Sequence, residues 1–559
     1  MNTDFPNRPP DTLPEKPKNI VICADGTGNT AIKGRGTNVF KMYEAIDQAG
    51  HRLHPHDQLR PQVAIYHDGV GTETVKWWRL LTGATGWGLS RNVKQLYAEL
   101  ARVYAPGDKI FLFGFSRGAF TVRTLAMLIH ACGILDLSSE RCRTNDAFWK
   151  TVNEAYREYR RAYNSYLTGL FSRTRPLTRA RVAELRKRFS VPIPENEGTS
   201  KGKLIQFIGV WDTVDAVGLP FRVSQFVNAF IYAFKFPDRT LNSSVEHACH
   251  ALALDEERES FAPVLWDESK TEAPHRIEQV WFAGVHSNVG GGYPKHGMSL
   301  TALDWMMWKA ARFGLRFVPA ERLSYRYHGD VDDKMYDSRA GLGVFYRWKP
   351  RDVEELCRRN GIVPKVHRSV FERIARNTEG YAPGSIPTEP QVVSSSASSV
   401  VTDTIRDLVA KQHGAGEPLL RQHAGVRRVG AWSYWLFVYA VLVTAGMTIV
   451  NWYGSVTSGV SGWKAIVWAL ATNVFTSKWI GLLLQTWWHH PILVAWLAGT
   501  FCLALWVDHR LDAAYSEFWH RNGLRLKLRR LMFSQVPCWG DVDPRGDLVG
   551  PTWSRRSEV

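Results

Sequence analysis

The sequence predicts an α/β fold, in which a doubly wound and mainly parallel sheet precedes a C-terminal α-helical transmembrane module. Three observations support this prediction: short apolar runs typical of buried strands, helical patterns between these runs, and a long, almost uncharged segment near the C-terminus. Strands of parallel sheets are covered on both faces and therefore read as continuous hydrophobic runs. The runs are Asn19–Ala24, Lys109–Gly114, Leu204–Val210 and Glu278–Val285.

Helical patterns separate the predicted strands, for example at Arg91–Tyr104 and Thr301–Phe313. Strands that alternate with helices are typical of parallel βαβ units. In such sheets, ligands bind beyond the carboxyl ends of the strands. The residues that follow each predicted strand are therefore the candidates for a functional site.

The composition limits the classes of function. Hydrophobic residues make up 45% of the 559 residues and charged residues 22%, which excludes disorder throughout. The seven cysteines form no CxxC pair, which argues against a disulfide framework or a cysteine zinc site and fits a reducing compartment. The net charge of +17 suits an anionic membrane surface or nucleic acid, but no nucleic-acid-binding motif accompanies it.

The almost uncharged segment predicts membrane spans. Residues 429–507 contain two formally charged side chains, Lys464 and Lys478, and many of the tryptophans that favour membrane interfaces. We expect two spans, near 432–452 and 491–508. Both flanks of this segment are basic, which places both in the cytoplasm and favours an even number of spans. A third span between the two and a buried helical hairpin in a soluble domain are the alternatives.

The chain divides into five predicted segments. The N-terminal residues 1–17 are polar, Pro-rich and disordered, and contain no apolar region of a secretory signal. The other segments are a catalytic domain at 18–390 with a basic helical insertion or lid at 141–200, a linker and juxtamembrane segment at 391–430, the transmembrane module at 431–508, and a basic cytoplasmic tail at 509–559. The insertion suits either a membrane interface or a solvated helical face.

The second predicted strand ends in Gly114-Phe115-Ser116-Arg117-Gly118, and a helical pattern follows at once. This is a G-x-S-x-G motif in the strand–turn–helix context of a nucleophile elbow. The turn holds the serine in a strained conformation and requires small neighbours. It also exposes the hydroxyl at a helix N-terminus, where a developing anion is favoured. Ser116 is therefore the candidate nucleophile, and a tight turn without catalytic role is the alternative.

A serine nucleophile needs a base that an acid orients, in the chain order Ser, Asp or Glu, His for this fold. Asp212 follows the strand Leu204–Val210, and Asp215 is the reserve candidate for the acid. His286 follows the last predicted strand and is the candidate base. His367 competes with it, but lies in a helical pattern that indicates a packing role.

The first strand leads into a glycine-rich loop that contains Asp25, Gly26 and Thr27. This loop could line the site or offer a backbone N–H to an oxyanion, with a second donor from the N–H of Arg117. The loop lacks the Lys-Ser/Thr of a phosphate-binding P-loop. A metal site built from Asp25, Asp212 and His286 is an alternative, but we expect neither a metal nor a cofactor.

These segments together resemble a bacterial α/β-hydrolase domain family, formerly of unknown function and now named after the type VI secretion phospholipase effectors of family one. The matching segments are CADGTGN at 23–29, YHDGVGT at 66–72, GDKIFLFGFSRGAF at 107–120, GVWDTVDAVG at 209–218, VWFAGVHSNVGGGY at 280–293, and VHRSVFERI with GYAP near 380. The resemblance carries the roles of nucleophile, acid and base onto Ser116, Asp212 and His286. Asn288 stands where the family often has Asp, so any acidic role there is missing.

The resemblance implies lipase or phospholipase activity. We therefore expect a membrane-anchored serine hydrolase that cleaves carboxylic esters of lipids, with membrane phospholipid and the bilayer as partners and no nucleic acid. Its expected location is the bacterial inner membrane, as a multi-pass protein with the catalytic domain in the cytoplasm. The alternatives are an esterase or thioesterase for a soluble substrate, and a non-catalytic membrane scaffold that retains the hydrolase fold.

Overall fold

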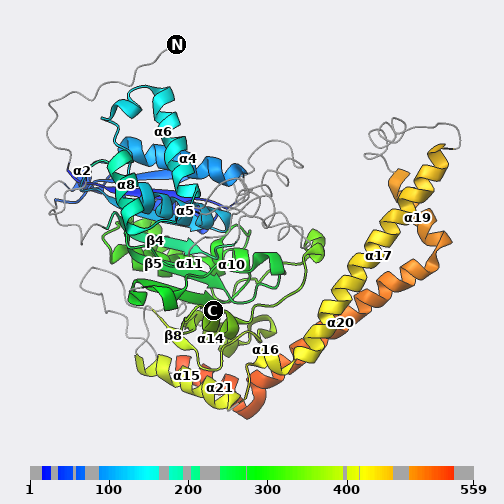
Figure 1. Cartoon of the computed structure of the whole chain (residues 1–559). Helices are drawn as coiled ribbons and strands as arrows, with labels where there is room; N and C mark the ends of the chain where they lie inside the picture. The colour runs from blue at the N-terminus through cyan, green and yellow to red at the C-terminus, as the bar shows by residue number, and fades with distance from the viewer. Residues whose placement is uncertain are drawn as a thin grey trace.

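The described residues of the computed structural model are 16–26, 36–54, 58–68, 87–162, 176–192, 203–214, 239–271, 273–394, 399–414, 416–457 and 478–533. Within them one sheet runs in the order β2-β1-β3-β4-β5-β6-β7-β8, and every neighbouring pair is parallel (Figure 1). The strands are β1 (Asn19–Ala24), β2 (Gln62–His67), β3 (Lys109–Phe115), β4 (Ile205–Trp211), β5 (Val245–Ala253), β6 (Ile277–Phe282), β7 (Lys365–His367) and β8 (Gln391–Val393). The order reverses between β1 and β3, and ligands of such sheets bind at the carboxyl ends near this point.

Helices cover both faces of the sheet, because successive strand residues point to opposite faces. Ile20 and Ile22 pack with one helical layer, and Val21 and Cys23 pack with the other. The first layer contains α4 (Trp87–Val103), α5 (Arg117–Cys132), α6 (Asn145–Arg160) and α8 (Arg179–Phe189). The second contains α1 (Asn38–Ala45), α10 (His286–Gly290), α11 (Gly297–Ala311) and α12 (Pro319–His328). This arrangement confirms the predicted α/β class with a mainly parallel sheet.

A third apolar cluster surrounds β7 and β8 at the edge of the sheet. It includes Ile405 and Val409 from α15 and Leu524 and Leu528 from α21, all of them buried. The helices here are α13 (Val353–Arg359), α14 (Arg368–Arg376), α15 (Ser399–His413), α16 (Leu419–Gln422) and α21 (Leu524–Phe533). The remaining short elements are α2 (Gly50–Leu53) and the 3-10 helices Glu140–Cys142, Glu259–Phe261, Glu268–Lys270, Pro274–Arg276, η7 (Gly341–Phe345), Thr378–Gly380 and Arg521–Gly523.

Two long helices, α17 (Ala424–Thr457) and α20 (Pro491–His520), pack against each other and extend away from the sheet (Figure 1). The shorter α19 (Lys478–His489) precedes α20. By length and composition, the segments Ala424–Val450 and Pro491–Phe533 are long and apolar enough to cross a membrane. We call the pair α17 and α20 the hairpin.

The structure differs from the predicted boundaries at the C-terminal side. The sheet continues to β8, and α15 packs on the sheet domain where a linker was expected from residue 391. The expected tail from residue 509 begins inside α20, and Leu524, Leu528 and Met532 of α21 are buried in the same cluster. The burial of α21 was not predicted because its arginines and lysines outnumber the buried leucines that hold the helix in place.

Candidate active site

Ser116 lies between the last residue of β3 and the first residue of α5. Its backbone has φ 57° and ψ −122°, a left-handed conformation that is strained for a residue with a Cβ. The serine side chain is mostly buried, and its N–H donates to the carbonyl of Trp211 at 3.0 Å. Strand, strained serine and helix thus follow one another directly, which is the geometry that a nucleophile elbow requires.

The two glycines of the motif are required by close packing. A Cβ on Gly114 would meet the backbone of Gly118 and Ala119 at 2.6 to 2.7 Å. A Cβ on Gly118 would collide with the carbonyl oxygen of Ala24, at the end of β1. The first turn of α5 is thus pressed against the end of the neighbouring strand, and only glycine allows this approach.

The register of β3 and β4 brings the predicted acid beside the serine. Phe115 pairs with Trp211, so Ser116 and Asp212 are the next residues at the same edge of the sheet. Asp212 is fully buried and also has a positive φ, 37°. Its Oδ2 lies 2.6 Å from Nδ1 of His286, the first residue of α10 after β6. Two of the three predicted residues, which follow strands β4 and β6, are therefore hydrogen-bonded to each other.

Arg351 is a second partner of the Asp212 carboxylate. Its Nη1 donates to Oδ1 at 2.7 Å and its Nη2 donates to Oδ2 at 2.9 Å. The same two nitrogens donate to the carbonyl oxygens of Ala253 and Phe261 at 2.5 and 2.6 Å. Burial alone would raise the pKa of Asp212, but Arg351 and His286 outweigh it and hold this pKa well below its usual range. Asp212 is therefore ionised at neutral pH.

The imidazole of His286 is enclosed by aromatic rings. The ring of Phe115 lies 4.6 Å away between centroids, and the ring of Phe261 meets it edge-on at 5.0 Å. Burial lowers the pKa of His286, and its hydrogen bond with Asp212 partly offsets this. The backbone N–H of His286 donates to Oε2 of Glu256 at 3.2 Å. A neutral imidazole whose Nδ1–H is oriented by Asp212 leaves Nε2 able to accept a proton.

Within the described residues, no hydrogen bond joins the Ser116 hydroxyl to His286. The residue before the serine, Phe115, contacts the histidine ring. Catalytic hydrogen bonds often tighten only when substrate is bound, so the arrangement remains compatible with a base acting on Ser116. The reserve candidate Asp215 lies outside the described residues. His367 caps α14. Its Nδ1 is hydrogen-bonded to the Ser369 hydroxyl at 2.8 Å and its ring stacks on Phe282 at 4.6 Å, in agreement with a packing role.

The first-strand loop reaches the site through Asp25. The collision expected for a Cβ on Gly118 also involves the carbonyl of Asp25, so this residue lies against the first turn of α5. The Asp25 carboxylate accepts hydrogen bonds from Gly26 N at 2.6 Å, Thr37 Oγ1 at 2.6 Å and Tyr66 OH at 2.8 Å. The N–H of Gly26, one of the groups that this loop could offer to an oxyanion, is thus engaged by Asp25. Thr27 lies outside the described residues.

Arg117 begins α5, and its backbone N–H lies at the helix N-terminus, next to the nucleophile candidate. N–H groups in the first turn of a helix have no partner within the helix, which makes this position suited to an anion. The Arg117 side chain is half-buried, and burial lowers the pKa of its guanidinium to about 10. The backbone N–H of Arg117 stays a predicted oxyanion donor because it adjoins Ser116 at the start of α5.

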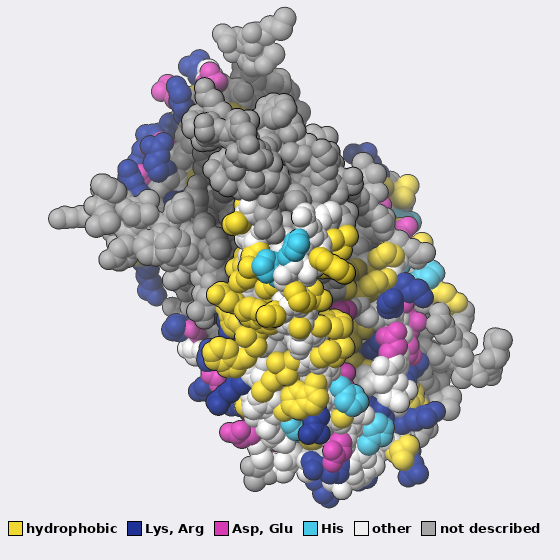
Figure 2. Space-filling view, turned by 90° about the vertical axis from the view of Figure 1, so that its right-hand side faces the viewer, with side chains coloured by type: hydrophobic (Ala, Val, Ile, Leu, Met, Phe, Trp, Pro, Cys, Tyr) yellow, Lys and Arg dark blue, Asp and Glu magenta, His cyan; other side chains and the backbone are white. Residues whose placement is uncertain are grey.

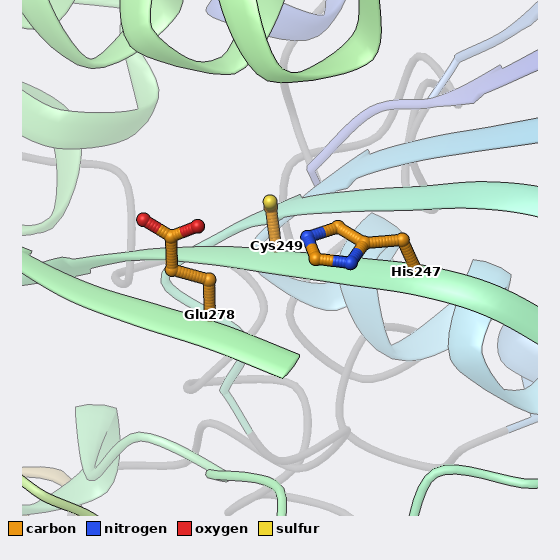
Figure 3. A group of neighbouring side chains, drawn as sticks. All are labelled: His247, Cys249 and Glu278. Carbon is orange, nitrogen blue, oxygen red and sulfur yellow. The ribbon is translucent and has the colours of Figure 1, made fainter. Parts of the chain in front are cut away.

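The alternative metal site is not assembled. Among the described residues, the ligand atoms that come within 4.8 Å of one another belong to a different group, His247, Cys249 and Glu278 (Figure 3). His247 and Cys249 come from β5 and Glu278 from the adjacent β6, toward the amino ends of these strands. Nζ of Lys309 lies 2.5 Å from Glu278 Oε2, and this ammonium both occupies the carboxylate and repels a cation. We therefore read this group as a packed ion pair.

Three residues that shape the site, Arg351, Asp255 and Glu256, were not predicted from the sequence. Arg351 lies in a polar stretch, RWKPRD, with no motif, and Asp255 and Glu256 follow β5, which was not predicted. The Asp255 carboxylate accepts from Gly284 N at 2.6 Å and from Tyr381 OH at 2.8 Å. Burial raises the pKa of Asp255 to about 6. These acids fix the turn that carries His286.

Two proteins similar to this chain are both described as uncharacterized. The chain is 27% identical over 258 residues to the uncharacterized protein YEL023C of Saccharomyces cerevisiae, and the match covers 44% of this chain and 32% of the yeast protein. A crystal structure of an uncharacterized protein from Pseudomonas aeruginosa matches at 15% identity with a TM-score of 0.30. That match covers 92% of this chain and 63% of the other. The chain thus spans about a third of the yeast relative's length.

Residues 18–309 match the family model described as T6SS, phospholipase effector Tle1-like, catalytic domain. This segment includes β1 to β6 and all three predicted catalytic residues, and it confirms the resemblance found in the motifs. Since the match covers more than half of the sequence, the chain belongs to the Tle1-like phospholipase effector family through its catalytic domain.

Proposed function

We propose that the protein is a serine hydrolase of lipid carboxylic esters, with Ser116 as nucleophile, His286 as base and Asp212 as the acid that orients it. Membership of a phospholipase effector family supports a lipid substrate. The observation that carries the proposal is the buried hydrogen bond of 2.6 Å between Asp212 and His286, at the same sheet edge as the strained Ser116.

The chemistry follows from these positions. Ser116 Oγ attacks the ester carbonyl while Nε2 of His286 takes its proton, and Asp212 stabilises the imidazolium through Nδ1. The N–H of Arg117 at the start of α5 donates to the oxyanion. His286 then returns the proton to the leaving alcohol, which leaves an acyl-serine. Water, deprotonated by His286, releases the carboxylic acid and restores the hydroxyl.

We further propose that the hairpin anchors the enzyme in a bilayer. Large hydrophobic side chains are exposed along both helices, which is costly in water; examples are Trp432, Tyr439 and Leu442 of α17 and Ile492 and Phe501 of α20. Figure 2 views the side of the molecule that carries the hairpin, and its hydrophobic side chains form a broad band there, with charged side chains and histidines beyond the band's lower end. The basic flanks favour cytoplasmic placement of the catalytic domain.

Hydrolysis of phospholipid vesicles by the detergent-purified full chain and its Ser116→Ala variant tests the proposed activity. We expect the wild type to release fatty acid and the variant to be slower by several orders of magnitude, since only binding and oxyanion stabilisation remain. Thermal melting of both proteins controls for folding. If the wild type cleaves only a soluble ester or thioester, the lipid substrate is wrong. If a folded wild type cleaves none of these, the non-catalytic scaffold is the better account.

A further inference from the structure

A cavity lies between the catalytic domain and the hairpin. Its lining comes from three places: Val344 and Trp348 in and after η7, Tyr434 and Phe437 on α17, and Phe501 and Ala504 on α20. The space is about 70 Å³, larger than a single water requires. Most of the side chains around it are apolar.

The charges at the cavity favour an uncharged occupant. Two charged side chains, Arg339 and Asp508, also line it, and their charges are opposite. An ionic ligand would therefore be attracted by one of these side chains and repelled by the other. An apolar chain would bind with a favourable free energy, because its surface would leave water. This balance argues against a free anion such as phosphate.

The cavity lies at the level of the hairpin where aromatic side chains face outward. Trp435 on α17 and Trp506 on α20 are 37% and 45% exposed, close in sequence to the cavity residues Tyr434 and Ala504. Tryptophan is enriched where a protein meets the boundary between lipid and water. An occupant that enters from the hairpin side would therefore come from the bilayer, at the depth where acyl chains begin.

Aromatic contacts connect the cavity with the proposed catalytic base. The ring of His286 meets that of Phe261 at 5.0 Å, and Phe261 meets Tyr346 at 5.7 Å. The next residue back along the chain, Phe345, lies 6.0 Å from Phe437 in the cavity wall. The carbonyl of Phe345 also accepts a hydrogen bond of 2.7 Å from Tyr434 OH, which ties η7 to α17. A series of packed aromatic rings thus connects the hairpin with the proposed base.

We propose that this cavity receives an acyl chain of a membrane lipid and directs the ester of that lipid toward Ser116. The directing role rests on the proposed function, since only a hydrolase needs the ester close to Ser116. Binding of the chain itself depends only on the cavity.

Photo-crosslinking tests the binding directly and without turnover. The probe is a phosphatidylcholine with a diazirine in one acyl chain, mixed into phosphatidylethanolamine and phosphatidylglycerol vesicles that carry the full-length Ser116→Ala variant. We expect adducts on the peptides that contain Phe437 or Val344, and a loss of at least fivefold for the Ala504→Trp version, whose indole fills the cavity. The matched control is Leu505→Trp, because Leu505 is exposed and lies outside the cavity.

The ratio of rates on a long-chain phospholipid and on a soluble butyrate ester tests the directing role. Filling the cavity should lower this ratio at least tenfold in Ala504→Trp and leave it unchanged in Leu505→Trp. An unchanged ratio in Ala504→Trp, or adducts confined to outward-facing residues, would overturn the inference. If no ester is cleaved but the crosslinks appear, the proposed function fails while the binding site stands.

Discussion

Arg351 and Asp212 form a paired, fully buried hydrogen-bond fork, with 2.7 and 2.9 Å between the guanidinium nitrogens and the carboxylate oxygens. Oδ2 of Asp212 also lies 2.6 Å from Nδ1 of His286. Because Arg351 also binds the carbonyls of Ala253 and Phe261, it fixes the acid relative to the end of β5 and to the wall around the histidine. We regard Arg351 as a positioning residue.

Replacement of Arg351 tests this relationship. Arg351→Ala leaves the Asp212 charge buried without its cationic partner, so we expect a loss of about 3–5 kcal/mol in the free energy of unfolding. Arg351→Lys keeps the charge but not the fork, and should unfold at a denaturant concentration closer to wild type while losing activity mainly in kcat. Urea unfolding with parallel kinetics checks both. Equal kcat in Arg351→Lys and wild type would show that the fork does not position the acid.

The pH dependence of activity reports the base. The pKa of His286 is lowered from its ordinary value of 6.5 by burial, only partly offset by Asp212. The base must be neutral to accept a proton, so activity is present above this lowered pKa and is lost as the pH falls through it. We expect the acid limb of kcat/KM to have its midpoint below 6.5, and lower still in Asp212→Asn, which removes the opposing effect. A wild-type midpoint at or above 7 contradicts this assignment.

The elbow should not tolerate a larger residue at Gly118. A Cβ there collides with the carbonyls of Ala24 and Asp25, so Gly118→Ala should cost about 1–3 kcal/mol of stability and displace the start of α5. Gly425→Ala in α17 is the matched control, because nothing lies within 4 Å of its Cβ position. Chemical denaturation measures both. Similar stabilities for the two variants would show that the packing at the elbow is looser than described.

Topology is tested in intact cells. With two spans, a single cysteine in place of Ser458, between the two apolar helices in the sequence, should react with an impermeant thiol reagent. A cysteine in place of Ser534 should not, because both basic flanks are expected inside. The cysteine-free protein is the control for background labelling. Reaction at position 534 would contradict the two-span model.

Hydrophobic runs and motifs in the sequence predict four strands of the sheet: β1, β3, β4 and β6. The run Asn19–Ala24 forms β1 with the same bounds, and the other three predicted strands agree within a few residues. Strand β5 was missed because His247 and His250 interrupt its apolar run. In the fold, His247 stacks on Phe313 at 4.7 Å and His250 accepts from the N–H of Thr213 at 3.0 Å, so tertiary contacts accommodate both rings.

The candidate site was predictable where a strand end carries a recognisable motif. Ser116, Asp212 and His286 each follow a strand, and parallel pairing then brings these ends to one edge. Arg351 could not be predicted, because it lies 139 residues from Asp212 along the chain and no local pattern marks it. The burial of α21 was equally hidden, since its fit against α14 depends on a surface formed by distant segments.

Active-site labelling with a fluorophosphonate tests the central claim most directly. The reagent forms a covalent adduct only with a serine whose hydroxyl is activated, so digestion and mass spectrometry of the full chain identify that residue. We predict one adduct, on Ser116, that is lost in Ser116→Ala and much slower to form in His286→Ala. Ester hydrolysis by a wild-type protein that carries no adduct at Ser116, or an adduct on another serine, would contradict the account.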